Sequence, residues 1–466
     1  MPRPEYSVAM TQAVHQELLT FLLRADGQED LLFALYTPSA GAERFTALIT
    51  AVVYPQVGDR EVHGNASFHG QYLERVQRLA LEQGCGVVFL HSHLGPGWQG
   101  VSHDDVRADR RISETAVAVT DLPLLSMTLG TDGTWSARAW YPQGERIRAC
   151  WATHVRVVGS MLAVSFADHL RPAPKPTPLQ RRTVAVWGET QQASMTRLTI
   201  GNVGLGSVGS QVCEGLARAG FTRLVLIDHD RVEAHNLDRL TGAYLEDLGE
   251  LKVDVAGRNA LRSSTAVNLE IRRVPHSVTG EEGYRAALDC DVLFSCVDRP
   301  QPRRLLDHLA YAHLVPVIDG GIRVHHQDGQ FRGVNWQVQT AGPGRPCLKC
   351  VGAFDAGEAD MDAKGLLDDP SYVAGLPNGN PLKASENVFS FSSAVASLET
   401  LQLFALVTGF QNFGVQRFDF NAGSMEAYVD EKSSLNCRCK THLLGTGDTL
   451  VDWHAHDLIL EAQRKT

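Results

Sequence analysis

The chain has 466 residues, 44% hydrophobic and 21% charged, so it is long enough for two or three globular domains with sizeable cores. Its formal net charge of -10 argues against nucleic-acid binding as its main role. The N-terminus lacks a basic region followed by a long apolar run, and serines, Glu399 and Gln402 interrupt the apolar stretch at 388–409. We therefore expect a cytoplasmic protein without a membrane span.

A proline-rich stretch divides the chain into two parts. Arg171–Leu179 reads RPAPKPTPL, and alternating prolines exclude both a helix and a central strand. Such a segment is typical of an extended spacer between domains. We predict an N-terminal domain over 1–165, a linker over 166–180 and a C-terminal domain over 181–466.

Apolar runs alternate with segments of helical periodicity in both parts, which predicts α/β domains. In the N-terminal part the expected strands are 31–36, 46–54 and 86–90, and the expected helices are 70–83 and 103–115. In the C-terminal part the expected strands are 198–203, 223–228, 292–296 and 315–319, with a helix at 207–219. The second alternation predicts a doubly wound, Rossmann-like sheet.

Two histidines follow the apolar run at 86–90. Residues two apart in a strand face the same side, so His91 and His93 can reach one ion, and Asp105 opens the next helical segment. Two imidazoles and one carboxylate leave the fourth tetrahedral position open to water, as in catalytic zinc sites. Ser102 can donate a hydrogen bond to the oxyanion that forms when water attacks a carbonyl group. The alternative is a polar surface loop with incidental histidines.

The segment from His91 to Asp105 resembles the JAMM motif of the MPN/JAB metalloproteases. Members of that family cleave isopeptide or peptide bonds after ubiquitin-like tails. Eight residues separate His93 from Ser102, one more than is usual in the family. The resemblance covers about residues 10–145. It implies a cytidine-deaminase-like α/β fold with a catalytic Zn²⁺.

The JAMM resemblance also implies a glutamate upstream of the histidines, acting as general base. Glu29 lies just before an early apolar run, where the family has this residue. Glu43 and Glu61 are rivals, and surface glutamates are usually only solvated. We assign the base to Glu29.

A glycine-rich turn follows the expected strand at 198–203. Gly204, Gly206 and Gly209 form G-x-G-x-x-G at the start of a helix, where glycine permits a tight turn and the helix N-terminus faces phosphate. Asp228 lies 19 residues after Gly209 and can bind ribose hydroxyls. This fingerprint alone fits a dehydrogenase equally well.

The sequence that begins at Asp228, DHDRVEAHNLDR, favours a different family. It resembles the D-x-D-x-V-x-x-x-N-L-x-R signature of ThiF, MoeB and the ubiquitin-activating enzymes. The resemblance covers about residues 180–440 and implies that a carboxylate at the end of a ubiquitin-like protein attacks the α-phosphate of ATP. The residues that it assigns to ATP and Mg²⁺ are Asp228, Asp230, Asn236, Arg239, Lys252 and Asp298. Arg239 and Lys252 would neutralise phosphate charge, and Asp298 would hold Mg²⁺.

Members of this second family also place an arginine in the site of a neighbouring subunit. The arginine comes from just upstream of the first strand, where this chain has Arg181 and Arg182. Both Arg181 and Arg182 remain candidates for the role. The resemblance therefore implies a homodimer.

Four of the nine cysteines lie in two close pairs. Cys347 and Cys350 form C-x-x-C, whereas Cys437 and Cys439 are one residue short of that spacing. Many members of the ThiF family hold a structural zinc with two such pairs, so we expect a closed Zn²⁺ site here. His442 is an alternative fourth ligand. The isolated cysteines are expected in the core.

The two resemblances together imply one polypeptide that both processes and activates a ubiquitin-like (β-grasp) partner, with a conjugating-enzyme-like protein as a possible second partner. Ubiquitin-activating relatives usually pass the acyl group to a cysteine after the first zinc pair, but residues 351–436 contain none. A serine such as Ser385, a cysteine from elsewhere or a partner's nucleophile remain as acceptors. The rival functions are an NAD-dependent oxidoreductase with a regulatory N-terminal domain and a scaffold with one inactive site.

Overall fold

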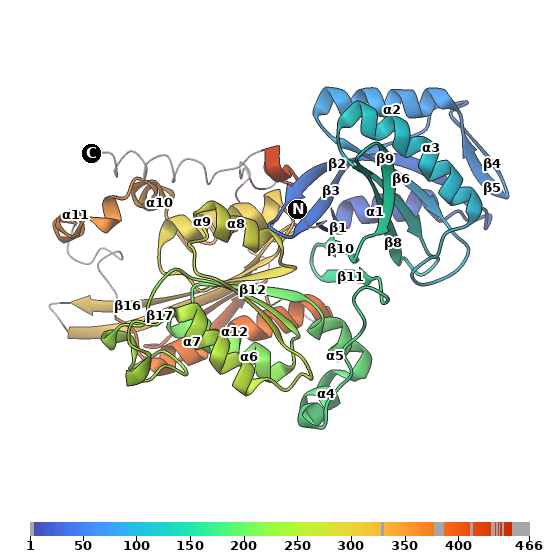
Figure 1. Cartoon of the computed structure of the whole chain (residues 1–466). Coiled ribbons are helices and arrows are strands. Elements are labelled where there is room, and N and C mark those ends of the chain that lie inside the picture. Colours follow the sequence, from blue (N-terminus) through green and yellow to red (C-terminus); the bar gives the residue numbers. More distant parts are fainter. Residues whose placement is uncertain are drawn as a thin grey trace. The chain divides into compact units, whose positions relative to one another are not determined.

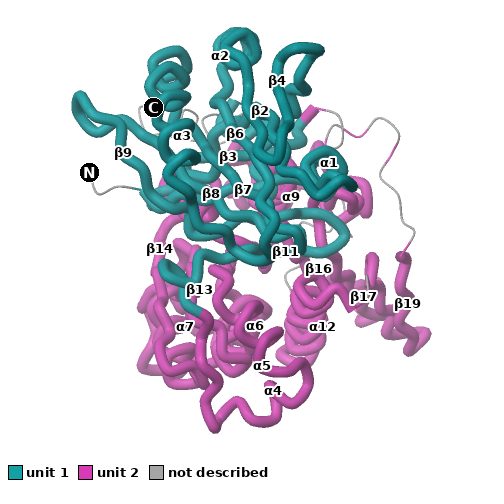
Figure 2. The backbone as a smooth tube through the Cα atoms, turned by 90° about the vertical axis from the view of Figure 1, so that its right-hand side faces the viewer, with its two compact units in different colours: residues 1–172, 312–314, 443–450 teal, residues 173–311, 315–442, 451–466 magenta. Residues whose placement is uncertain are grey.

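The computed structural model describes residues 4–327, 330–376, 386–410, 413–429, 434, 437, 439 and 442–449. The chain forms two compact units, which Figure 2 distinguishes by colour. Unit 1 comprises Met1–Pro172, Ala312–Leu314 and Leu443–Leu450, and unit 2 comprises Ala173–Tyr311, Val315–His442 and Val451–Thr466. The first break between the units, after Pro172, lies inside the segment predicted as a linker. The two short segments that the second half of the chain contributes to unit 1 were not predicted.

Unit 1 is built on a nine-stranded mixed sheet in the order β11-β10-β1-β3-β2-β6-β7-β8-β9. Its strands and helices are β1 (Glu5–Thr11), α1 (Gln12–Leu22), β2 (Leu31–Ala40), β3 (Arg44–Val53), β4 (Arg60–His63), β5 (Asn65–Phe68), α2 (Gly70–Gln83), β6 (Gly86–Ser92), α3 (His103–Thr120), β7 (Leu124–Leu129), β8 (Trp135–Gln143), β9 (Arg146–Trp151), β10 (His154–Val158) and β11 (Leu162–Phe166). β4 and β5 form a separate hairpin.

The sheet of unit 1 has apolar side chains on both faces. One core cluster joins the sheet to α1 through Leu18 and Leu22, and another joins it to α2 and α3 through Tyr72, Val76 and Ile112. Central strands such as β2 and β6 are therefore almost continuously apolar, because both of their faces are covered. Where the apolar run of β6 ends, the polar residues of the predicted metal site begin.

Unit 2 is built on an eight-stranded sheet in the order β14-β13-β12-β15-β16-β17-β18-β19. Its elements are η1 (Pro178–Gln180), α4 (Arg181–Trp187), α5 (Glu189–Thr196), β12 (Thr199–Val203), α6 (Ser207–Ala219), β13 (Arg223–Ile227), η2 (Ala234–Asn236), η3 (Leu245–Asp247), α7 (Lys252–Ser263), β14 (Glu270–Val274), α8 (Glu281–Leu288), β15 (Val292–Ser295), α9 (Pro300–Ala312), β16 (Val317–Gln327), β17 (Gln330–Ala341), α10 (Ala356–Ala363), η4 (Leu366–Asp368), α11 (Pro370–Gly375), α12 (Phe389–Thr408), β18 (Val415–Asp419) and β19 (Ser424–Tyr428).

Only half of this second sheet is the parallel, doubly wound sheet that the sequence predicts. β12 to β16 pair in parallel, whereas β16 to β19 pair antiparallel. α8 and α9 cover one face of the sheet, and α6, α7 and α12 lie on the other (Figure 1). The strand order reverses between β12 and β15, and ligands of such sheets bind at the carboxyl ends of the strands that flank this point.

Within the described part of the chain, only α12 combines the length and the apolar composition of a membrane span. Half of its most apolar stretch is buried, and Glu399 and Gln402 are among its buried side chains. The core helix of a soluble protein has the same composition.

The N-terminal strand of unit 1 carries an ion-pair cluster with a pH-dependent contribution to stability. Burial alone would raise the pKa of Glu5, but Arg44 and Arg171, 3.5 Å and 3.1 Å away, help to lower it from 4.5 to about 2. This stability is therefore present above pH 4.5 and is lost as the pH falls towards 2. We expect Glu5→Gln to lower the free energy of unfolding by roughly 2–3 kcal/mol at pH 7. Urea titrations of both proteins should show the difference shrinking between pH 4.5 and 2.

Candidate functional sites

Three polar side chains of unit 1 converge where β6 ends. His91 lies in β6, His93 follows the strand, and Asp105 lies in the first turn of α3. The two Nε2 atoms are 3.2 Å apart, and each lies 3.5 Å from a carboxylate oxygen of Asp105. With metal–ligand bonds of about 2.0–2.1 Å, tetrahedral zinc ligands lie about 3.3 Å apart. The separations of these three donor atoms therefore fit a zinc ion.

Glu29 lies two residues before β2, whose register with β6 indicates where it lies relative to this triad. β2 and β6 are antiparallel, and Leu31 pairs with His91. Continuing that register by two residues sets Glu29 opposite His93, on the face that carries both histidines. The charges of His93 and Asp105 both act on the Glu29 carboxyl group, which is consistent with this position. This register favours Glu29 over Glu43 and Glu61 as the base.

Ser102 is the N-cap of α3. Its Oγ accepts a hydrogen bond from the Asp105 N–H at 3.1 Å, and its own N–H donates to Asp105 Oδ2 at 2.7 Å. This capping box fixes the Asp105 carboxylate relative to the helix. Because the hydroxyl acts as an acceptor, its proton remains available for a further acceptor in the site.

The protonation preferences of His91 and Asp105 suit a cation. Burial lowers the pKa of His91 to about 4, which keeps its imidazole neutral at pH 7. Burial would raise the pKa of Asp105, but the hydrogen bond with His93 and the neighbouring His91 and Ser102 hold it well below its usual value. The hydrogen bond with Asp105 raises the pKa of His93. Burial raises the pKa of Glu29, as a proton-accepting base near neutral pH requires.

A buried ion pair close to the triad was not predicted from the sequence. Asp109, one turn after Asp105 on α3, is fully buried and accepts hydrogen bonds from the guanidinium of Arg138 and the indole N–H of Trp140 on β8. Burial raises the pKa of Asp109 to about 6 in spite of Arg138. A single sequence gives no signal for this pairing, because its partners lie 29 and 31 residues away on another element.

The glycine-rich turn of unit 2 lies at the predicted switch point, between β12 and α6. Gly204 has φ +84°, and a Cβ atom there would lie 2.5 Å from the carbonyl oxygen of Cys296, beyond β15. A Cβ at Gly209 would lie 1.9 Å from the carbonyl oxygen of Gly204. Both positions therefore require glycine, whereas Gly206 faces open space. The turn leaves the N-terminus of α6 accessible to an anion.

Asp228 and Lys252 flank this turn. Asp228 follows β13 and accepts hydrogen bonds from the N–H groups of Leu205 (2.6 Å) and Asp230 (2.8 Å). Burial raises the pKa of Asp228 although Lys252 lies nearby. Lys252 begins α7, and its Nζ lies 2.8 Å from a carboxylate oxygen of Asp230. The structure thus brings together the glycine turn, Asp228, Asp230 and Lys252.

The other residues assigned to nucleotide binding either form hydrogen bonds with residues close to them in the chain or are exposed to solvent. The Asn236 side-chain oxygen accepts from the Glu233 N–H, and Arg239 donates to the carbonyl oxygen of His235 and to Asp238. Asp298 is exposed and lies three residues beyond the end of β15, at the same edge of the sheet as the glycine turn. Arg181 and Arg182 are exposed in the first turn of α4.

The sequence model of the ThiF family matches residues 179–441, more than half of the chain. The chain belongs to the ThiF family. The prediction of a ThiF-type, Rossmann-like domain is thereby confirmed, whereas the JAMM/MPN assignment of unit 1 stays a prediction.

Curated relatives match about a third of the chain. Molybdopterin-synthase adenylyltransferase of Escherichia coli K12 is 34% identical over 152 residues, which are 32% of this chain and 56% of the relative. Adenylyltransferase and sulfurtransferase uba4 of Aspergillus terreus is 31% identical over 153 residues, 32% of this chain and 30% of the relative. Ubiquitin-like modifier-activating enzyme 5 of Drosophila willistoni is 25% identical over 194 residues, 38% of this chain and 45% of the relative. The chain thus spans about half, or less, of the length of these relatives.

Among solved structures, one match is the crystal structure of E. coli MccB with ATP. That chain is 15% identical with a TM-score of 0.43, and the match covers 57% of this chain and 74% of MccB.

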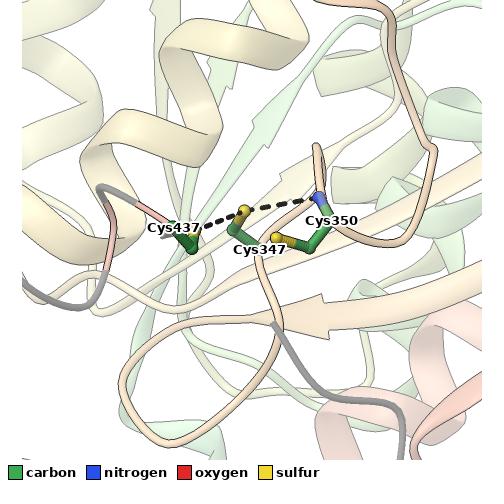
Figure 3. Close-up of side chains that lie close together, drawn as sticks. All are labelled: Cys347, Cys350 and Cys437. Carbon is green, nitrogen blue, oxygen red and sulfur yellow. Dashed lines mark hydrogen bonds between the residues drawn. The ribbon is translucent and has the colours of Figure 1, made fainter. Parts of the chain in front are cut away.

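The ThiF region also contains the predicted cysteine centre. Cys347, Cys350 and Cys437 have their sulfur atoms within 4.8 Å of one another (Figure 3). The Sγ atoms of Cys347 and Cys437 are 3.5 Å apart, close to the roughly 3.8 Å that Zn–S bonds of about 2.3 Å give in a tetrahedron. These three cysteines can hold a zinc ion.

Cys439 joins this centre from the other side. It groups with Cys347 and with the buried Asp307 of α9, whose Oδ1 accepts a hydrogen bond from the Leu348 N–H at 2.8 Å. His442 is exposed and belongs to neither group of described ligand atoms, so Cys439 is the better-placed fourth ligand. Asp307 was not predicted, because an isolated aspartate within a helical pattern gives no sign of its burial.

A polar cavity of about 530 Å³ in the ThiF region was also not predicted. It lies on the antiparallel half of the sheet, and its lining includes Arg303, Asp319, Arg323, Gln337 and Arg417. Asn335, Gln337 and Gln339 of β17 line it, while Val334 and Val338 belong to the apolar core. The cavity extends from this face to Gly352 and Ala353, just beyond the first cysteine pair.

Proposed function

We propose that this chain adenylates the C-terminal carboxylate of a small ubiquitin-like protein in its ThiF region. We further propose that it hydrolyses a peptide or isopeptide bond after such a tail at the metal site of unit 1. The observation that carries the first proposal is the ThiF match, together with the glycine turn joined to Asp228. The observation that carries the second is the triad with Glu29 in register opposite His93.

In the adenylation step, one oxygen of the substrate carboxylate attacks the α-phosphorus of ATP, and pyrophosphate leaves. The N–H groups at the start of α6 face the phosphates, and Asp228 accepts from the ribose hydroxyls. Lys252 exchanges its contact with Asp230 for a phosphate, and Arg239 adds a second positive charge. Asp298 and Asp230 offer the oxygen ligands that Mg²⁺ prefers. The polar cavity beside Arg303, of about 530 Å³, would receive the extended tail.

In the hydrolytic step, Glu29 accepts a proton from the attacking water and delivers it to the leaving amine. Ser102 donates its hydroxyl proton in a hydrogen bond to the oxygen of the scissile carbonyl group. His91, His93 and Asp105 would hold the zinc ion, which supplies a Lewis acid for the water and the carbonyl. The cysteine centre would hold a second, structural zinc ion.

Several partner assignments belong to the same proposal. The curated relatives include a ubiquitin-like modifier-activating enzyme and adenylyltransferases with sulfurtransferase activity, which supports a ubiquitin-like or sulfur-carrier partner. We place the protein in the cytoplasm, as a homodimer in which Arg182 or Arg181 reaches the neighbouring nucleotide site. A conjugating-enzyme-like protein would receive the activated tail. Partner-dependent exchange of pyrophosphate into ATP separates this proposal from the oxidoreductase, which would bind NADH without ATP.

The absence of cysteine from residues 351–436 leads to a specific prediction about the activated tail. Serine and threonine hydroxyls need an adjacent base to act as nucleophiles, so we expect the adenylate to pass directly to a nucleophile on the partner. With ATP and a β-grasp protein ending in Gly-Gly, the chain should exchange pyrophosphate without forming a reductant-sensitive adduct on a denaturing gel. A reductant-sensitive adduct would identify a thioester on another cysteine. A reductant-resistant adduct that hydroxylamine cleaves would identify a serine ester.

A further inference from the structure

A second carboxylate adjoins the proposed general base but faces the opposite way. Asp30 is only 1% exposed and immediately precedes β2. Because alternate residues of an extended strand point to opposite faces, Asp30 points away from the histidines if Glu29 points towards them. Asp30 therefore cannot itself touch the reacting groups.

Asp30 is tied to the residue between the two histidines. Its N–H donates to Ser92 Oγ at 3.0 Å, and the Ser92 N–H donates to the Asp30 carbonyl oxygen at 3.0 Å. The Leu31 N–H donates to Asp30 Oδ1 at 2.7 Å. These hydrogen bonds fix the backbone on the C-terminal side of Glu29 against the strand that carries the metal ligands.

Two arginines neutralise the buried Asp30 carboxylate. Arg60, the first residue of β4, places NH1 2.6 Å from Oδ1, and Arg24, beyond the end of α1, places NH1 3.2 Å from Oδ2. Burial of an unpaired carboxylate is energetically unfavourable. Removal of either arginine should therefore destabilise Asp30 in its present position. Within the same hairpin, the Gly64 N–H donates to Gln28 Oε1 at 2.9 Å. The β4–β5 hairpin thus holds the chain on both sides of Glu29.

We propose that Asp30 and Arg60 are positioning residues for Glu29, so that the β4–β5 hairpin belongs to the hydrolytic apparatus. The inference rests on the proposed peptidase activity. A catalytic side chain must be held within about 0.5 Å of its productive position by supporting contacts, and the Asp30–Arg60 pair supports the residue next to Glu29.

The test uses the full-length, zinc-loaded protein and a quenched fluorescent probe, in which a peptide ending in Gly-Gly is joined to a lysine ε-amine. We expect Asp30→Asn and Arg60→Gln to lower kcat by about 10- to 100-fold, with KM and bound zinc unchanged. Arg60→Lys keeps the charge and should recover a large part of kcat. The matched control is Arg75→Gln, which removes the ion pair of Arg75 with Asp59 near the same hairpin. Arg75 and Arg60 side chains are equally exposed, at 20%, and the control should leave kcat unchanged.

Equal losses of kcat in Arg60→Gln and Arg75→Gln, or loss of zinc from Arg60→Gln, would overturn the positioning role. Hydrogen exchange separates this inference from the proposed function. Arg60→Gln should speed exchange of the Asp30 and Ser92 amides relative to Arg75→Gln, whether or not the probe is cleaved. Absence of cleavage by the unmodified chain would count against the peptidase, whereas equal exchange in the two variants would count against the positioning role.

Discussion

Glu29→Gln should abolish cleavage of ubiquitin-like fusions and leave zinc bound, whereas His91→Ala should lose both cleavage and zinc. His91 is one of three ligands whose donor atoms lie within 4.8 Å of one another, so its loss leaves two. Glu29 lies opposite His93 by register and would move protons without binding the metal. Loss of a general base costs about 100- to 10,000-fold in rate. The assay compares the initial rate of fusion cleavage with the zinc content of each purified variant.

Glu61→Gln is the matched control for this prediction. Glu61 is a rival glutamate on the exposed β4 strand, where it pairs with His69 at 3.3 Å. Its substitution should leave the rate unchanged. Normal cleavage by Glu29→Gln would show that the base has been assigned to the wrong residue, and activity in the presence of a strong chelator would exclude the metal site altogether.

The residues at the ends of strands were the part of each site that the sequence could predict. One motif is H-S-H after an apolar run, and the other is three glycines between a strand and a helix. In both, the spacing in the sequence determines how the residues lie in space, because it falls within one strand or one turn. The structure accordingly brings His91 and His93 together, and it brings the glycine turn to Asp228. Glu29 could be preferred to its rivals only weakly from sequence, because its position depends on the register of β2 with β6.

The residues that support each site could not be predicted from a single sequence, because their contacts also depend on how distant elements pair. Asp30 pairs with Arg60, and Asp109 with Arg138, across distances in the chain that no periodicity reports. Asp307 meets the cysteine centre through the backbone N–H of Leu348. The antiparallel half of the second sheet was also missed. Its strands alternate core and cavity residues, whereas the expectation of parallel pairing came from the Rossmann-like half.

Lys252→Ala should abolish partner-dependent exchange of pyrophosphate into ATP. In the structure the Lys252 ammonium group lies 2.8 Å from Asp230 and acts on the charge of Asp228, so it is the cation at the centre of the predicted nucleotide site. Adenylation develops negative charge on phosphate oxygens, and removal of one group that stabilises such charge costs about 100- to 1,000-fold in rate. Lys252→Arg keeps the charge but not the compact shape, so it should recover only part of the activity.

Arg218→Ala provides the control for Lys252→Ala, because it also removes an ion pair from the ThiF region. Arg218 pairs with Glu214 at 2.6 Å in the last turn of α6, at the opposite end of that helix from the glycine turn. Exchange by Arg218→Ala should match that of the unmodified chain. Asp298→Ala should abolish exchange, as Lys252→Ala does. Raising the Mg²⁺ concentration should recover exchange in Asp298→Ala alone, because Asp298 is assigned to the metal and Lys252 is not. Full exchange by Lys252→Ala would show that this lysine does not bind the phosphates. Tight NADH binding without any ATP dependence would favour the oxidoreductase function over adenylation.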